Sequence, residues 1–367
     1  MASTADRVRE LIAQLGLSQH EFAGQIGLDD SKLSKSLSGT RRFSSLDLAR
    51  IAELCKVTVD WLITGEEPPL AVAARTTGGS AAAAIAVARR LTAQREDLTA
   101  LGVAQPWRPV AAPLGRGLRT EQADRLAIAA LERAAEAGRS VTEPRLAELV
   151  EDIFGADVAV VDLGAGFDGL AASSDAAKLI VLATSQIPGR QRFTLGHELG
   201  HLLAGDDHGV HLDKDIFDRA QQKDPSEMRA NAFAAAFLMP EAILRERVGR
   251  SGLTEAGFAE LACDLLVSPA TLAYRLLSLR LIDNGTCDRF KSISGAGAAS
   301  LAGRTSEWAQ RVVEASSPRP PGPLVRDAYM AYESGATTLR PYANLFGVDA
   351  DALREALEAE SGMRPAS

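Results

Sequence analysis

The pentapeptide His197-Glu198-Leu199-Gly200-His201 restricts this chain more than any other feature of its sequence. In an α-helix, residues four positions apart lie on one face, so a helix here presents both imidazoles to a single zinc ion. Apolar residues at positions 193, 195, 199, 202 and 203 favour such a helix. The alternative is an ordinary helix with two surface or core histidines. We expect His197 and His201 as zinc ligands, with Glu198 placed to take a proton from metal-bound water as the general base.

A catalytic zinc site needs a third protein ligand. The spacing HExxHxxGxxH would place a glycine at position 204 and a histidine at position 207, but alanine and aspartate stand there. That spacing is missed by one residue, so His208 and His211 are weaker candidates. Polar loop histidines without a ligand role are the favoured interpretation for both.

Glu227 is the third candidate. It begins a helical pattern behind a proline, and Asn231 follows one turn later on the same face. The following segment AFAAAFLMP indicates a largely buried helix, in which a carboxylate needs a partner. A solvated helix face is the alternative for an isolated glutamate. We expect Glu227 close to the histidines, with Asn231 hydrogen-bonded to a ligating histidine and orienting it.

Two blocks together resemble the ImmA/IrrE metallopeptidase family: RQRFTLGHELGH at 190–201 and EMRANAFAAAFLMP at 227–240. An apolar β-like run at 178–184 fits the same pattern, and the resemblance covers about 120–285. It implies a zinc site of His197, His201 and Glu227, with Glu198 as the acid/base. It also implies a protein substrate, which in that family is typically a separate helix-turn-helix repressor whose cleavage releases genes for stress response or mobile-element transfer.

Residues 17–37 have the apolar spacing of a helix-turn-helix, with Gly27 in the turn and Asp29 placed to cap the next helix. The apolar pattern continues through two further helices, and the stretch ends in VDWLITG at 59–65. The whole stretch resembles the XRE, lambda-repressor-like family. An interaction with double-stranded operator DNA is therefore expected.

The resemblance also indicates which residues contact DNA, because the second helix of such a motif enters the major groove. Base contacts are expected from Ser31, Lys32 and Lys35. Phosphate contacts are expected from Gln19, Arg41 and Arg42. Residues 1–67 hold eight basic and ten acidic side chains, but the basic ones cluster at 32–42, where a DNA-binding face needs them. The alternative is a helix-turn-helix used for dimerisation or protein contact.

The composition of the 367 residues is that of an ordinary folded, soluble protein, and the net charge of −8 excludes a whole-chain, nonspecific polyanion binder. Three widely separated cysteines argue against a disulfide framework and fit a reducing cytosol. The N-terminus lacks the apolar core of a signal peptide, and the longest near-apolar run, 81–88, is too short to span a bilayer. We therefore expect a cytoplasmic protein with no membrane segment.

The pattern along the chain predicts a mainly α protein with a small β-sheet, an α+β class, in four parts. These are a helix-turn-helix DNA-binding domain (1–67), a linker with one helix (68–119), a metallopeptidase-like domain (120–285) and a helical C-terminal region (286–367). Strands are expected at 157–163 and 178–184. The stretches 261–276 and 339–357 also have helix-turn-helix-like spacing, and core helix pairs are the favoured interpretation for both.

These features predict a cytosolic transcriptional regulator that combines sequence-specific DNA binding with zinc-dependent peptide-bond hydrolysis. The hydrolase activity is expected to act on a partner repressor in a stress-type response, and dimerisation is expected of a reader of two half-sites. One alternative is a DNA-binding sensor whose peptidase-like domain binds a ligand or partner without cleaving it. Another is a protease whose helix-turn-helix only docks a repressor and binds no operator.

Overall fold

The computed structural model describes residues 3–15, 17–55, 57, 62, 79–110, 118–164, 167–206, 211–213, 225–249 and 252–362. The chain divides into two compact units, Met1–Ala71 and Val72–Ser367. Helices predominate, and the second unit contains a four-stranded sheet. The predicted α+β class is therefore confirmed.

The first unit contains α1 (Thr4–Leu15), α2 (Gln19–Gln25), α3 (Asp30–Leu37) and α4 (Ser45–Cys55). Ser18 and Glu21 form a capping box at the start of α2, and the Asp29 side chain accepts from the backbone N–H of Lys32 at 2.7 Å to cap α3. Gly27 adopts φ +65° in the turn between these helices. A fully buried core holds the unit together, made by Val8, Phe22, Ala23, Leu33 and Ile51.

The sheet of the second unit contains β1 (Asp157–Val161), β2 (Gly169–Ser173), β3 (Lys178–Ala183) and β4 (His211–Asp213), in the order β1-β3-β2-β4. β1 pairs with β3 in parallel, and β2 runs antiparallel to both β3 and β4. The sequence predicted β1 and β3 but not β2 or β4. β2 reads GLAAS, which lacks the β-branched and aromatic residues typical of strands, and β4 has three residues only.

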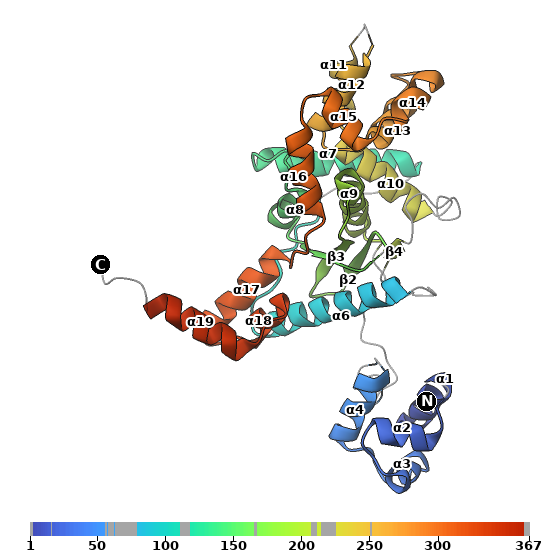
Figure 1. The fold of residues 1–367 in the computed structure, drawn as a ribbon, viewed down its shortest axis with the longest axis vertical. Helices are drawn as coiled ribbons and strands as arrows, with labels where there is room; N and C mark the ends of the chain where they lie inside the picture. The colour runs from blue at the N-terminus through green and yellow to red at the C-terminus, as the bar shows by residue number, and fades with distance from the viewer. Residues whose placement is uncertain are drawn as a thin grey trace. The chain divides into compact units, whose positions relative to one another are not determined.

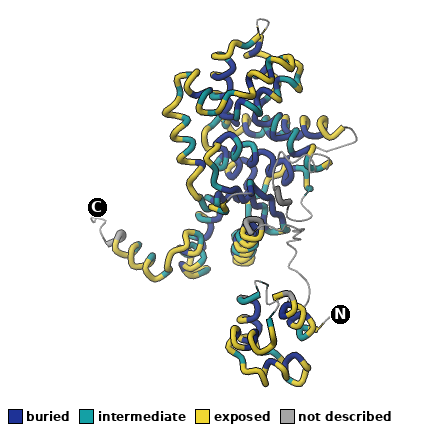
Figure 2. Tube along the Cα trace, turned by 45° about the vertical axis from the view of Figure 1, so that its right-hand side comes forward, coloured by how far each residue is buried: buried dark blue, intermediate teal, exposed yellow. Residues whose placement is uncertain are grey.

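Helices cover both faces of the sheet (Figure 1). α9 (Pro188–Ala204) packs on β2 and β3 from one side, together with α8 (Leu146–Phe154), while α6 (Gly79–Ala100) and α17 (Gly322–Glu333) pack from the other. Strands β1, β2 and β3 are consequently buried on both faces, as the dark blue centre of Figure 2 shows. α7 (Arg119–Glu136) and α10 (Pro225–Leu238) pack on each other, and α10 also packs along α9.

The remaining helices are α11 (Glu241–Val248), α12 (Glu255–Asp264), α13 (Pro269–Ser278), α14 (Asn284–Lys291), α15 (Gly295–Leu301), α16 (Thr305–Ala315), α18 (Arg340–Phe346) and α19 (Ala350–Gly362). The stretch 261–276 is a buried helix pair, as expected, with Leu272 fully buried. The stretch 339–357 is largely exposed, so the prediction of a core pair is wrong there. Among the described residues no single helix is long and apolar enough to cross a membrane; only α12 and α13 together meet those criteria, bent by 104°.

α6 is an integral part of the second unit. It buries a stripe of side chains at helical spacing, made by Ala84, Ala88, Leu91, Arg95 and Leu98. The Arg95 guanidinium donates to both carboxylate oxygens of Asp157 in β1 at 2.8 Å and to Asp327 Oδ2 in α17 at 2.6 Å. The prediction of a linker over 68–119 is therefore corrected for α6, because buried charges anchor this helix to the sheet.

The C-terminal region also packs on the sheet. Arg319 exchanges two backbone hydrogen bonds of 2.8 Å with Val160 of β1, and its guanidinium donates to Glu151 of α8 at 3.0 Å. The predicted separation of 286–367 from 120–285 is therefore absent, since both belong to the same compact unit. These contacts join residues more than 150 positions apart, which local periodicity does not reveal.

The Arg95 ion cluster predicts a large stability effect. Arg95→Met leaves Asp157 buried without a cation and Asp327 with only the exposed Arg326, and we expect a loss of about 3–5 kcal/mol in the free energy of unfolding. Urea unfolding followed by circular dichroism measures this. Arg90 is exposed on the same helix, so Arg90→Met is the matched control and should stay within about 0.5 kcal/mol of wild type. Equal midpoints for the two variants would contradict the anchoring role of Arg95.

Candidate metal centre

Glycines on α9 allow α10 to approach it closely. A Cβ atom on Gly200 would lie 2.8 Å from Cδ1 of Phe233 in α10, and one on Gly196 would lie 3.4 Å from the Cβ of Ala234. Phe233 is fully buried at this contact. Only glycine at position 200 permits this separation without displacing the ring. The first turn of α10 therefore lies beside the face of α9 that carries the HExxH residues.

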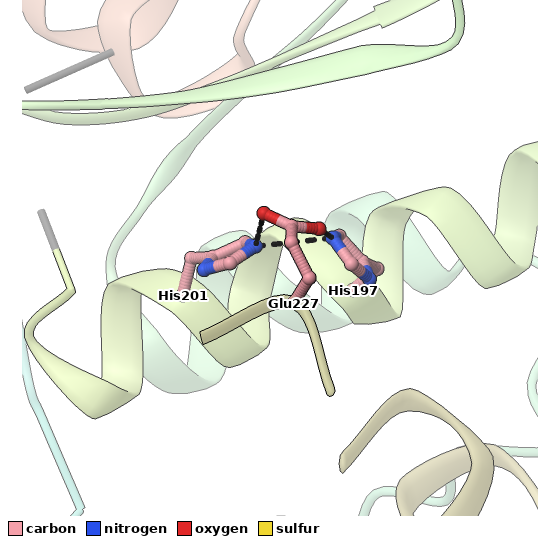
Figure 3. A group of neighbouring side chains, drawn as sticks. All are labelled: His197, His201 and Glu227. Carbon is pink, nitrogen blue, oxygen red and sulfur yellow. Dashed lines mark hydrogen bonds and ion pairs between the residues drawn. The ribbon is translucent and has the colours of Figure 1, made fainter. Parts of the chain in front are cut away.

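This packing brings His197, His201 and Glu227 together (Figure 3). The Glu227 carboxylate lies 3.2 Å from His197 Nε2 and 3.3 Å from His201 Nε2, and the two imidazole Nε2 atoms are 3.0 Å apart. Both histidines are essentially inaccessible to solvent, with exposed fractions of 0% and 1%. The structure thus brings together the three side chains that the sequence predicted as metal ligands.

The arrangement fits a tetrahedral metal ion. Ligand atoms at zinc bond lengths in a tetrahedron are separated by about 3.3 Å, which is close to the separations of the three side chains. The donor set of two imidazoles and one carboxylate is also one that metals accept. The cluster can therefore hold a metal ion with little rearrangement.

The second nitrogen of each imidazole faces a polar group. His197 Nδ1 lies 3.1 Å from Asn231 Oδ1, so an Nδ1–H donor there leaves Nε2 free to face the cluster. His201 Nδ1 lies 3.4 Å from Asp206 Oδ2, and Asp206 also forms an ion pair with Arg229 of α10. Sequence reasoning identified Asn231 but missed Asp206. The one sequence feature that could have indicated Asp206 is its position directly after Gly205, the glycine that ends α9 in a left-handed backbone conformation.

Negative charge dominates the surroundings of the imidazoles. Burial alone would lower the pKa of His201, but hydrogen bonds to Asp206 and Glu227 outweigh it and raise the pKa to about 9. Burial opposes ionisation of Glu227 as well, yet its hydrogen bonds to His197 and His201 hold its pKa well below the usual range. A buried cluster that favours positive charge in this way is suited to a cation.

Glu198 lies next to the cluster, between α9 and β2, with 1% of its surface exposed. A Cβ atom on Gly169 of β2 would lie 3.3 Å from Glu198 Oε1 and 2.5 Å from the methyl group of Thr194. The absence of a side chain at position 169 therefore makes the space that Glu198 occupies. His208 lies outside the described residues, and the side chain of His211 is not among those described.

The predicted DNA-contacting residues lie mostly on the surface of the first unit. Ser31, Lys32 and Lys35 are exposed on α3, and Gln19 and Arg42 are exposed as well. Lys32 also forms an ion pair of 3.0 Å with Asp29.

Arg41 differs from the other predicted contacts. Its guanidinium donates to Ser36 Oγ and Asp47 Oδ2, both at 2.8 Å, and the side chain is about one-third exposed. The structure therefore gives Arg41 a role inside the module, and its phosphate contact stays a prediction.

Each of the two units resembles a known class of domain, a helix-turn-helix domain in the first and a protease-like domain in the second. Residues 5–68 match the family model described as a helix-turn-helix domain, and residues 153–277 match the one described as an IrrE N-terminal-like domain. The chain thus joins these two domains, which confirms both predicted resemblances.

Two curated relatives carry the name radiation response metalloprotease IrrE. The protein from Deinococcus radiodurans is 38% identical over 99 residues, which cover 27% of this chain and 30% of the relative. The protein from Deinococcus deserti is 31% identical over 177 residues, which cover 42% of this chain and 63% of the relative. The chain therefore spans less than two thirds of either relative, and the similarity supports a metallopeptidase domain.

Asn231 provides a test of the metal centre. Because it fixes the orientation of a ligating imidazole, Asn231→Ala should weaken zinc binding about 10- to 100-fold. Competition with a chromophoric chelator measures the affinity. Asn344 is exposed on α18, so Asn344→Ala is the control and should bind zinc like wild type. Unchanged affinity in Asn231→Ala would argue against a positioning role.

Proposed function

We propose that this protein is a cytoplasmic transcriptional regulator that binds operator DNA and hydrolyses peptide bonds in a partner protein at a zinc centre. The convergence of His197, His201 and Glu227 beside Glu198 carries this proposal. Both curated relatives are named radiation response metalloprotease, and this name supports a stress-related role and a protein substrate. The matches cover only 30% of one relative and 63% of the other, so that role is a proposal for this chain. The cytoplasmic location is supported by three cysteines that are all free.

Zinc fits this donor set because two imidazoles and one carboxylate leave a fourth position open, and zinc supplies an acidified water and a polarised carbonyl when bound. The residues of the chain have separate tasks. His197 and His201 would hold the ion from one helix face, and Glu227 would complete the ligand set from α10. Asn231 and Asp206 fix the two imidazole rings.

Glu198 is the group placed to move protons. It follows His197 directly on α9, and its carboxylate is buried at the sheet beside the cluster. A carboxylate in this position accepts the proton of the attacking water and delivers it to the leaving amine nitrogen. The surrounding burial keeps bulk water from competing for that proton.

Glu198→Gln separates chemistry from metal binding. The variant keeps the three metal ligands, so we expect full zinc content and a loss of peptide cleavage of at least about 100-fold, as for removal of a general base. The measurement compares new protein N-termini in cells that express wild type or variant, with and without stress. Glu246 is exposed on α11, and Glu246→Gln should leave the pattern of cleavage unchanged.

A new N-terminus that persists in Glu198→Gln cells would contradict the proposed role of Glu198. Operator binding without any wild-type-specific N-terminus would favour the alternative function, a DNA-binding sensor whose protease-like domain cuts nothing. The zinc content of the purified wild-type and variant proteins is measured as well. Equal zinc content shows that a loss of cleavage is not caused by a loss of metal.

The DNA-binding proposal predicts different effects for two cationic residues. A duplex selected by the wild-type protein from a random library is the probe. Lys35→Ala should bind this duplex about 5- to 150-fold more weakly and change the base preference at its contact. Arg42→Ala should weaken all duplexes alike and reduce the slope of log affinity against log salt by about 1. Wild-type affinity and salt slope in both variants would instead support a helix-turn-helix that contacts protein.

A further inference from the structure

A cavity of about 370 Å³ lies in the second unit. Its walls come from α8, α9 and α16, which lie side by side in Figure 1, and from strands β1 and β3. Much of the wall is apolar, contributed by Leu146, Val160, Leu182, Leu195 and Pro318. The volume is within the range of cavities that take small molecules. No residue of the metal centre lines it.

Arg192 of α9 lies in the wall of this cavity with 7% of its surface exposed. Its terminal nitrogens donate to the backbone carbonyls of Val141 and Pro144, while its Nε has no hydrogen-bond partner. Within the described part of the chain Arg192 forms no ion pair. A buried guanidinium without a counter-ion is costly, because burial penalises the charged form. Glu143 is the carboxylate whose charge acts on Arg192, and its ion pair, at 2.8 Å, is with Arg139.

A second arginine faces the same cavity. Arg311 of α16 is half-buried, and it donates to the Leu266 carbonyl at 2.8 Å without an ion pair to any described residue. Burial lowers the pKa of Arg192, and the like charge of Arg311 adds to this, giving a value of about 9. Burial is also the main cause that lowers the pKa of the Arg311 guanidinium. Arg192 and Arg311 are thus two cations in the same wall, and neither forms an ion pair with the carboxylates that act on it, Glu143 and Glu314.

The neighbouring carboxylates have other partners. Glu148 pairs with Arg145 at 3.4 Å, and Glu314 accepts from the side chain of Gln310 at 3.0 Å. The third lining arginine that is partly buried, Arg319, is already neutralised by a glutamate of α8. Gln310 is uncharged, so Glu314 keeps its negative charge near Arg311, but the two cations Arg192 and Arg311 still outnumber it in the wall.

We propose that this cavity binds a small organic anion, with a carboxylate or phosphate group between Arg192 and Arg311 and an apolar body against the surrounding side chains. Guanidinium groups suit both kinds of anion because they donate several N–H groups in a planar fork. The apolar wall selects against inorganic ions, which have no body to bury. This site goes beyond the proposed peptidase function and does not depend on it.

Binding would also join α16 to α9. Of the eleven residues of α16, only Ala315 is buried, so the described contacts hold this helix weakly. An anion held by one arginine from each helix supplies a charge-assisted link between them. α16 should consequently become more protected from exchange with solvent when the cavity is occupied.

The test uses the full-length protein and isothermal titration calorimetry. The probes are phenylacetate and phenyl phosphate, with 2-phenylethanol as the neutral analogue and inorganic phosphate as the headgroup alone. We expect at least one aromatic anion to bind about tenfold or more tightly than the neutral analogue and inorganic phosphate, because charged hydrogen bonds and apolar burial act together. The preferred headgroup distinguishes a carboxylate ligand from a phosphate ligand.

Arg311→Gln should reduce the affinity for the bound probe about tenfold or more. Arg304 lies two turns earlier beside the same helix but is paired with Asp264 and Glu307, so Arg304→Gln is the matched control and should bind like wild type. Glu198→Gln should also bind the probe normally, which separates this proposal from the peptidase function. Equal binding of the anions and 2-phenylethanol, or full binding by Arg311→Gln, would overturn the proposal. So would binding of neither anion.

Discussion

The metal centre depends on the close contact between α9 and α10. Phe233 lies where a side chain at position 200 would otherwise project, so the two helices approach only because that residue is glycine. Glu227 is six residues before Phe233 on α10, within a rigid helix that rises about 1.5 Å per residue. A methyl group at position 200 would push α10 outward and carry the carboxylate away from both imidazoles. The carboxylate oxygens lie only 3.2–3.3 Å from the two imidazole Nε2 atoms, and such a shift would lengthen both distances.

The sequence predicts the centre of the site better than its surroundings. His197 and His201 follow from helical spacing, and Glu227 with Asn231 follow from a charged start to an apolar helix. Asp206 has no such pattern, since its meeting with His201 depends on how the chain leaves α9. The contact of α6 with the sheet was missed for a similar reason, because Arg95 and its partners lie 62 and 232 positions apart. Strand β2 was missed because its small residues have little preference for strands, and the strand is stabilised by burial on both faces.

Buried charge serves two different purposes in the second unit. Around Arg95, every described charge meets an opposite one from another element, so the cluster joins α6, β1 and α17. Around Arg192 and Arg311 no described carboxylate forms an ion pair with either cation, and the hydrogen bonds of both guanidinium groups go to carbonyl groups. Dispersed carbonyl dipoles compensate a guanidinium less well than a carboxylate does. The first arrangement is neutralised by ion pairs within the fold, whereas in the second neither guanidinium has an ion pair with a described carboxylate.

α9 links these two sites in one element. Its first half carries Arg192 and Leu195 in the cavity wall, and its second half carries His197 and His201 at the metal centre. The helix is buried along most of its length between the sheet and α10, so it moves as a body and does not absorb a displacement locally. An occupant held by an arginine of α16 and an arginine of α9 therefore lies against the element that carries both imidazoles. Because Glu227 comes from α10, the packing of α10 on α9 sets the distances between its carboxylate and the two imidazoles.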